Sequence, residues 1–377
     1  MFDAIWHDQQ SRRDFFKACA SLAAISFAIG HAQEYGKVDP REASYYRSLA
    51  DGRIKCLLCP QGCTVPKGRR GLCRVRENRN GKYYTLAYGN PCAIHLDPIE
   101  KKPLFHFLPG TTALSIATAG CNFSCRYCQN WQISQTGPED TMNYRAPPDE
   151  IVDLALQKRE KLKSYTIAYT YTEPSIFYEY MFDIAKLAKK KGIKNIYHSN
   201  GYLNPKPLEA LSDYLDGANV DLKAFTEKFY NDICGGTKDP VLKTLTTLKK
   251  KGVHLEITNL VIPTLNDSDA EIEDLCKWVV DNLGKDTPIH FSRFYPMYKL
   301  TRINPTPVQT LKRAIEIARA EGLEYVFMGN VPNNKYEDTY CPKCGRSIIN
   351  RRGYQILDNH IKDGHCIYCN EKIAGVW

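Results

Sequence analysis

Cysteine is the residue that most constrains what this chain can fold into, because 15 cysteines occur in 377 residues. Eleven of them form three groups: an N-terminal group (Cys56, Cys59, Cys63, Cys73), a central group (Cys121, Cys125, Cys128) and a C-terminal group (Cys341, Cys344, Cys366, Cys369). Such close spacing lets several thiolates converge on one metal centre, which a disulfide framework does not need. The sequence therefore predicts three metal sites. The other four are expected to be small buried apolar side chains: Cys19, Cys92, Cys234 and Cys276.

Between about residues 111 and 335, short β-rich runs alternate with longer amphipathic runs. The expected strands are Ala113–Thr118, Tyr165–Tyr171, Asn195–His198, Gly217–Leu222, Leu255–Ile262, Ile289–Phe294 and Tyr325–Met328. The expected helices are Asp149–Leu162, Ser175–Lys191, Lys206–Tyr214, Lys238–Lys251, Asp267–Leu283 and Thr306–Glu321. This alternation indicates parallel β/α units. The fold class is therefore α/β, with a partial (β/α)6-type TIM barrel whose chemistry lies at the carboxyl ends of the strands.

The central cysteine group follows the first expected strand directly. It has CxxxCxxC spacing, and an aromatic residue, Tyr127, precedes its last cysteine. Iron–sulfur clusters usually take four cysteines, so a loop with three indicates a cluster with one iron kept open for a substrate or cofactor. A zinc loop would need a fourth ligand nearby, and the next cysteine downstream is the distant Cys234.

This motif resembles that of the radical S-adenosylmethionine (SAM) superfamily. The resemblance implies a 4Fe-4S cluster on Cys121, Cys125 and Cys128, whose open iron binds the amino and carboxylate groups of SAM. It implies reductive cleavage of SAM to a 5′-deoxyadenosyl radical, which abstracts hydrogen from a substrate. A low-potential electron donor is then a required partner. Tyr127 is expected to pack on the adenine of SAM or to shield the cluster from water.

Residues at the ends of later strands resemble SAM-contacting elements of this family. Glu173 lies in a Thr-Glu-Pro segment similar to the end of a Gly-Gly-Glu-Pro element, and both glycines are missing here. The resemblance implies that Glu173 receives the SAM amino group, which suits a carboxylate because charge-assisted hydrogen bonds are strong. Asn200 lies in a Ser-Asn-Gly segment similar to the family's Thr-Asn-Gly. Asp221 and Lys223 resemble an Asp-x-Lys element of glycyl-radical-enzyme activases, and His290 lies near the position of a SAM-contacting histidine in those activases.

Over about residues 110–332, the chain most resembles pyruvate formate-lyase activating enzymes. Activases with extra ferredoxin clusters insert those cysteines after the SAM loop, whereas here the additional cysteines precede it. The runs Cys56–Cys63, Gly71–Asn78, Asp97–Gly110 and Cys128–Trp131 resemble the AmmeMemoRadiSam group of activase-like proteins. That resemblance implies Memo-like or AMMECR-like partners and does not identify the substrate.

The two four-cysteine groups predict further metal sites. The N-terminal group lies in a turn-rich segment over residues 39–110, whose core is too thin to fold alone. Zinc and an auxiliary iron–sulfur cluster are both acceptable there, and the lack of an evident electron-transfer partner favours structural zinc. The C-terminal group has CxxC pairs with zinc-ribbon spacing in a domain over residues 336–377. A rubredoxin-like iron site is the alternative, and His360 or His365 could replace a ligand.

The first 38 residues carry the pattern of a twin-arginine export signal. Arg12 and Arg13 precede Phe-Phe-Lys and an apolar stretch over residues 18–29, which is too short to span a membrane. An amphipathic N-terminal helix is the alternative interpretation. Export would separate the protein from cytoplasmic SAM and reductant, so both locations stay open.

Charge narrows the class of function. The net charge of +9 is spread in pairs and runs such as Lys101–Lys102, which we interpret as solvated faces. Since no clustered basic stripe results, a nucleic-acid partner is not expected. The leading hypothesis is a SAM-cleaving enzyme that forms a radical on a protein, as a glycyl-radical activase does, or on a small molecule. The alternative is a non-catalytic iron–sulfur and zinc scaffold or redox sensor.

Overall fold

The computed structural model describes residues 33–377. The predicted export signal falls mainly on residues 1–32 and lies outside the described residues. Among the helices of the described part, none is both long and apolar enough to cross a membrane.

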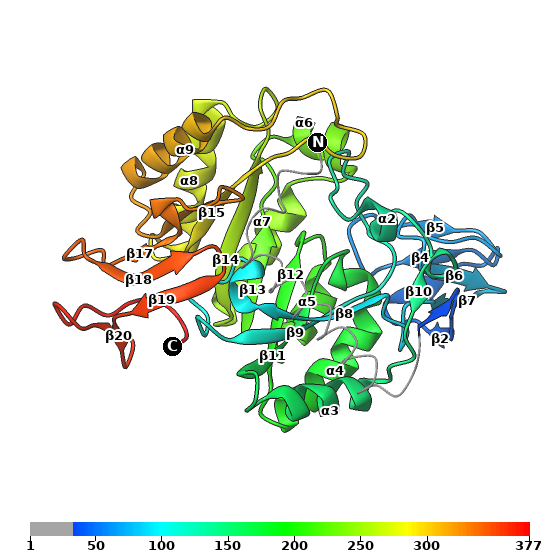
Figure 1. Cartoon of the computed structure of the whole chain (residues 1–377). Coiled ribbons are helices and arrows are strands. Elements are labelled where there is room, and N and C mark those ends of the chain that lie inside the picture. Colours follow the sequence, from blue (N-terminus) through cyan, green and yellow to red (C-terminus); the bar gives the residue numbers. More distant parts are fainter. Residues whose placement is uncertain (1–32) are drawn as a thin grey trace, which may run out of the picture.

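A sheet of eight strands forms the centre of the molecule (Figure 1). Its strands are β8 (Ala93–Pro98), β9 (Thr112–Ala117), β11 (Ser164–Tyr169), β12 (Lys194–Ser199), β13 (Gly217–Asp221), β14 (His254–Val261), β15 (Ile289–Arg293) and β16 (Val326–Gly329). The order across the sheet is β16-β15-β14-β13-β12-β11-β9-β8. All neighbours pair in parallel except β8, which runs antiparallel to β9. The seven parallel strands confirm the predicted strands and the mixed α/β fold.

Helices connect the parallel strands, and these too confirm the prediction. They are α3 (Pro148–Lys158), α4 (Tyr178–Lys190), α5 (Pro205–Ser212), α7 (Asp239–Lys250), α8 (Asp269–Leu283) and α9 (Val308–Ala320). Because the parallel strands follow one another in space as in sequence, successive right-handed crossovers put their helices on the same face of the sheet. The loops that follow the carboxyl ends of the parallel strands are left free to build a site. Short helices lie in these loops: α2 (Trp131–Ser134), α6 (Glu227–Phe229), η3 (Pro138–Asp140), η4 (Pro174–Phe177), η5 (Tyr230–Cys234) and η6 (Lys335–Glu337). A further short helix, η2 (Ile99–Lys101), lies in the connection between β8 and β9.

Two sets of short strands lie on opposite sides of the central sheet (Figure 1). The N-terminal set is β1 (Glu34–Tyr35), β2 (Arg41–Glu42), β3 (Tyr46–Ser48), β4 (Ile54–Cys56), β5 (Thr64–Val65), β6 (Arg76–Arg79) and β7 (Lys82–Thr85), and β1 pairs with β10 (Met142–Asn143). The C-terminal set is β17 (Thr339–Tyr340), β18 (Ser347–Arg352), β19 (Gln355–Asn359), β20 (Ile361–Lys362) and β21 (His365–Cys366).

Buried arginines join both sets to the core. Arg76 of β6, 1% exposed, forms an ion pair with Glu179 of α4, with 2.9 Å between Nη2 and Oε1. Arg351 of β18 donates from Nη2 to the carbonyl oxygen of Phe105 at 2.8 Å. Since a buried charge is stable only when it is paired or hydrogen-bonded, these contacts fix where each set of strands sits.

Candidate active site

The central cysteine group lines a cavity of about 880 Å³ at the carboxyl ends of the parallel strands. All three cysteines line this cavity, and Cys121 and Cys125 are each 8% exposed. Cys128 lies beside Ser134 of α2, with 3.2 Å between the sulfur and the hydroxyl oxygen. Three thiols that converge on one roomy cavity fit the donor set of an iron–sulfur cluster with an open iron.

Two glycines allow the chain to place this loop. Gly120 has φ of +92°, and a Cβ there would lie 2.4 Å from the carbonyl oxygen of Cys73. Gly235 has φ of +78°, and a Cβ there would lie 2.5 Å from the Ser124 hydroxyl. Only glycine adopts such conformations freely and permits such close approach. The loop is also held by backbone bonds, including one of 2.8 Å from the Ser124 amide to the carbonyl of Cys234.

Cys234 is a neighbour of the loop that sequence spacing did not reveal. Its side chain is fully buried, as expected, but its sulfur lies 3.8 Å from the Tyr127 hydroxyl. It also forms a hydrogen bond with Cys125, which lowers the pKa of the Cys125 thiol against the opposing effect of burial. The connection after β13 creates this contact between Cys234 and the loop, so the separation of the two along the chain did not indicate it.

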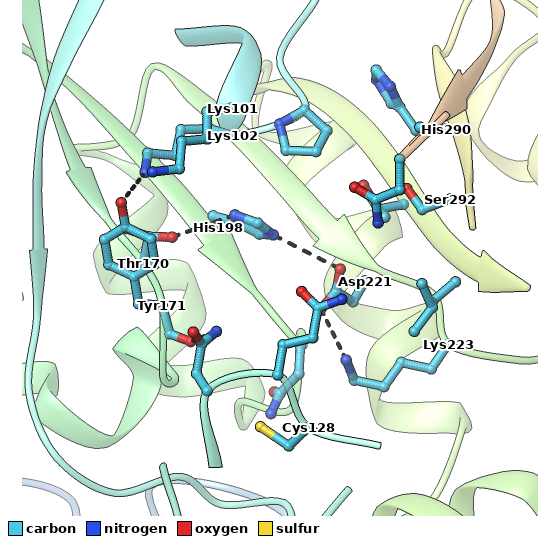
Figure 2. A pocket seen from close by; sticks show the side chains of 18 of the residues that line it. Lys101, Lys102, Cys128, Thr170, Tyr171, His198, Asp221, Lys223, His290 and Ser292 are labelled. Carbon is cyan, nitrogen blue, oxygen red and sulfur yellow. Dashed lines mark hydrogen bonds and ion pairs between the residues drawn. The ribbon is translucent and has the colours of Figure 1, made fainter. Parts of the chain in front are cut away.

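Asp221 is the last residue of β13 and Lys223 follows that strand, and the two side chains meet at the cavity wall (Figure 2). Lys223 Nζ lies 2.9 Å from Asp221 Oδ2, and His198 Nε2 lies 3.8 Å from Asp221 Oδ1. Burial raises the pKa of Asp221, but Lys223 and His198 outweigh it and hold that pKa below its usual range. Burial likewise opposes the charge of Lys223, and Asp221 raises its pKa above the usual value. The pair is thus charged and faces the same cavity as the three thiols.

Asn200 and Tyr127 also line the cavity. The side-chain amide nitrogen of Asn200, Nδ2, donates to Asn122 Oδ1 at 2.8 Å and lies 3.9 Å from the Cys121 sulfur. Tyr127 is 6% exposed, and Lys223 Nζ lies 6.0 Å from its ring centroid. Asn200 therefore lies next to the first cysteine, and the ring of Tyr127, within the loop, faces Lys223.

Glu173 lies behind the cavity wall, with an exposed fraction of 0%. Its Oε1 accepts from the Ser199 hydroxyl at 2.7 Å and from the Ser175 backbone amide at 2.9 Å. Its Oε2 accepts from the Asn200 backbone amide at 2.8 Å. Burial raises its pKa, while these hydrogen bonds oppose the rise. In this structure Glu173 supports the Ser199–Asn200 wall, and its predicted contact with the SAM amino group stays a prediction.

His290 of β15 lines the cavity at a distance from Cys128 (Figure 2). Its Nε2 lies 2.7 Å from Glu256 Oε2, and its ring stacks on Phe327 with 5.0 Å between centroids. Because Glu256 occupies Nε2, only the other ring nitrogen is free for a ligand. The predicted SAM contact of His290 stays a prediction.

The wall opposite the thiols carries residues that sequence analysis did not single out. Lys102 is 1% exposed, and its Nζ lies 2.6 Å from Asp97 Oδ2 and 3.1 Å from the Tyr171 hydroxyl (Figure 2). The interpretation of Lys101–Lys102 as a solvated pair is therefore wrong for Lys102. Burial lowers the pKa of Lys102 to about 8, although Asp97 opposes the change. The acidic residue five positions earlier was the available signal.

The C-terminal cysteine group forms a compact four-sulfur set. Its sulfur atoms all lie within 4.8 Å of one another, with 3.6 Å between Cys341 and Cys369 and 3.9 Å between Cys344 and Cys366. The group can therefore hold a metal ion, as predicted, and neither histidine of this segment belongs to the set. The N-terminal group lines a separate small cavity.

Comparisons with known proteins agree with this geometry. The Radical SAM superfamily model matches residues 115–279. An uncharacterized protein of Methanocaldococcus jannaschii is 44% identical over 335 residues, which cover 88% of this chain and 98% of that protein. The pyruvate formate-lyase-activating enzyme of Clostridium pasteurianum is 26% identical over 44% of this chain and 67% of its own length.

A solved structure, Streptococcus suis SuiB bound to S-adenosylmethionine, aligns with a TM-score of 0.47 at 14% identity, over 62% of this chain and 53% of that chain. The family match covers the cysteine loop after β9, the strands β11 to β14 and most of α8. This chain therefore belongs to the radical SAM superfamily and is an enzyme of the radical SAM type.

Proposed function

We propose that this chain binds a 4Fe-4S cluster on Cys121, Cys125 and Cys128, and binds SAM in the adjoining cavity. When bound together, cluster and SAM supply one-electron cleavage of SAM and a 5′-deoxyadenosyl radical for hydrogen abstraction. The observation that supports this proposal is the shared cavity, which brings the three thiols of the central group together with the charged Asp221–Lys223 pair. The family membership reported above implies the same two cofactors.

Different residues of the chain suit different groups of SAM. Lys223 has two ammonium hydrogens left after its bond to Asp221, and these suit a carboxylate. Asp221 keeps free lone pairs that suit ribose hydroxyls. Asn200 is oriented by its bonds to Asn122 and to the Tyr202 amide, so it presents a fixed edge beside Cys121. We assign these three residues to SAM binding and orientation.

Glu173 and His290 have different expected parts. Three hydrogen bonds occupy Glu173, which leaves about one of a carboxylate's roughly four lone-pair sites for the SAM ammonium. His290 lies far along the cavity, so its free nitrogen is better placed for a substrate or the distal end of SAM. Tyr127 is proposed to cover the adenine or to keep water from the cluster.

The cavity has room for a substrate beyond SAM. Ligand pockets usually have about 300–1,000 Å³, and this one lies near the upper end. Its outer wall includes Tyr295 and Tyr354, which are 40% and 52% exposed. We propose that a protein segment or a small molecule enters on this side. A protein substrate agrees with the activase-like relatives and with the Memo-like or AMMECR-like partners implied by the AmmeMemoRadiSam resemblance.

The finer predictions about architecture belong to the same proposal. We propose that the parallel strands form a partial (β/α)6-type barrel, which supports catalysis at its carboxyl ends. We also propose zinc in a ribbon-like C-terminal domain, because a tetrahedral ion with Zn–S bonds of about 2.3 Å holds its sulfurs roughly 3.8 Å apart. The separations of 3.6 and 3.9 Å agree with that value.

An anaerobic assay tests the proposed function. The cluster is reconstituted and reduced with dithionite, SAM is added, and 5′-deoxyadenosine is measured. We expect product from the native chain and none from Cys125→Ala. Cys276→Ala serves as the matched control, because Cys276 is a buried cysteine in α8, outside the cavity wall, and should keep the activity. A native chain with a full cluster that releases no product would contradict the proposal and favour a scaffold.

A further inference from the structure

The N-terminal cysteine group surrounds an enclosed cavity of its own. All four sulfur-bearing residues line it, and three of them, Cys56, Cys59 and Cys73, are less than a tenth exposed. Four cysteines, three of them buried, therefore line one cavity, as the ligands of a metal centre would.

The spacing of the sulfurs separates this group from the C-terminal group. Among the described residues, only the C-terminal four bring all their sulfur atoms within 4.8 Å of one another. One zinc ion needs that compact arrangement, because all four thiolates bind the same atom. Thiolates that bind different irons of one cluster lie farther apart. Within residues 33–377, neither the N-terminal nor the central group brings three of its sulfur atoms within that distance of one another.

Two buried donors also lack a partner at this cavity. The Tyr83 hydroxyl and Arg76 Nε have no hydrogen-bond partner within residues 33–377, and both residues line the cavity. Buried polar groups are nearly always satisfied, so these two indicate an acceptor that belongs in the cavity. The sulfurs of an iron–sulfur cluster accept such bonds, which tune its reduction potential.

The cavity adjoins the central cysteine loop. Asn122 lines it, and Gln61 Nε2 donates to the Asn122 carbonyl oxygen at 2.9 Å. The carbonyl of Cys73 packs against Gly120, the residue immediately before Cys121. On the outer side, Leu57, which follows Cys56, is 41% exposed, and Leu72, which precedes Cys73, is 62% exposed. The group therefore lies between the surface and the central loop.

We propose that the N-terminal group holds a second iron–sulfur cluster, not zinc, that passes electrons to the cluster of the central loop. The relay rests on the proposed function; the identity of the metal does not. A reduced, low-potential electron-carrier protein gives one electron to the second cluster, which is reduced by one unit. That electron then reduces the central cluster by one unit, and the second cluster returns to its oxidised state. No bond forms or breaks and no proton moves.

A full-length variant without the central ligands tests the metal. Cys121→Ala, Cys125→Ala and Cys128→Ala are combined, and the protein is reconstituted anaerobically with iron and sulfide. We expect about four irons and four sulfides per chain to remain, with an electron paramagnetic resonance signal after dithionite reduction. Adding Cys59→Ala and Cys63→Ala should remove iron and sulfide together. Zinc in place of iron and sulfide would overturn the proposal. Zinc retained at the C-terminal group, with an unchanged circular dichroism spectrum, serves as the control for folding.

A second measurement tests the contact between the two clusters. The spectrum of the reduced native protein is compared with the sum of the spectra of two variants, each with one cluster. We expect the native spectrum to differ from the sum, because neighbouring paramagnetic clusters interact. A native spectrum equal to the sum would overturn the electron relay. Failure here is distinguishable from failure of the proposed function, since 5′-deoxyadenosine formation with dithionite does not require the relay.

Discussion

Glu256 of β14 holds the loop before β9 against the sheet, although its exposed fraction is 0%. Its Oε1 accepts from the His106 amide at 2.7 Å and from His254 Nε2 at 3.0 Å. Its Oε2 accepts from the Phe105 amide at 3.0 Å and from His290 Nε2 at 2.7 Å. Burial raises the pKa of Glu256, but the two imidazoles outweigh it and keep the pKa below its usual range.

We predict that Glu256→Gln destabilises the protein by about 3 to 5 kcal/mol. Each carboxylate oxygen accepts one backbone amide and one imidazole, so the new amide nitrogen must face a backbone donor whose role cannot change. A buried donor left unpaired costs about 1–3 kcal/mol. The remaining bonds also lose their charge, which lowers each from about 1.5–3 to about 0.5–1.5 kcal/mol.

Urea unfolding of the metal-loaded chain, followed by circular dichroism, measures this loss. Glu316→Gln is the matched control, because Glu316 lies exposed on α9 and should change stability by less than about 0.5 kcal/mol. Loss of less than about 1 kcal/mol in Glu256→Gln would refute the reasoning, since it would mean that the four bonds do not depend on the carboxylate.

Four further predictions concern other parts of the molecule. Burial lowers the pKa of His106 to about 3, whereas an unfolded histidine titrates near 6.5. The unfolded chain therefore binds the extra proton first, and stability falls by about 2 kcal/mol from pH 7 to pH 5. Urea unfolding at both pH values should show a smaller fall in His106→Gln, and equal falls would contradict the assignment. Asp221→Asn should weaken SAM binding by roughly tenfold to a hundredfold in equilibrium dialysis, and an unchanged affinity would count against its role. Gly120→Ala should lower the iron bound after reconstitution, because its Cβ would lie 2.4 Å from a carbonyl oxygen; normal iron content would show that the loop adapts. Cys344→Ser should lower the zinc content of the C-terminal group and leave the iron content unchanged, and metal analysis of both checks this.

The sequence predicted the central fold because hydrophobic periodicity reports burial directly. Each of the seven parallel strands lies within two residues of its predicted ends, and the six helices between them are all present. The strand β8 was missed, because an edge strand that carries His95 and Asp97 has too few apolar residues to produce a clear pattern. Its antiparallel pairing with β9 depends on contacts that no local sequence signal contains.

The candidate site was predictable where a motif fixes the chemistry, and less so where the fold decides burial. The central group, Asp221 and Lys223 line one cavity. His198 was missed, because nothing in sequence distinguishes a strand-end histidine that faces the cavity from one that faces solvent. Lys102 was misassigned, since its partner Asp97 lies on the unpredicted strand. The wider sulfur spacing of the N-terminal group likewise emerges only in three dimensions.

The hairpin between β18 and β19 reaches back to the cavity, where Gly353 and Tyr354 form part of the wall. Arg351, just before the turn, anchors that hairpin to Phe105. A shortened chain that ended after β16 would keep the central cysteine group and all eight strands of the central sheet, yet it would lose one side of the cavity. A catalytic fragment of this length should therefore expose the radical to solvent. The last forty or so residues belong in any version of the protein that is used to identify its substrate.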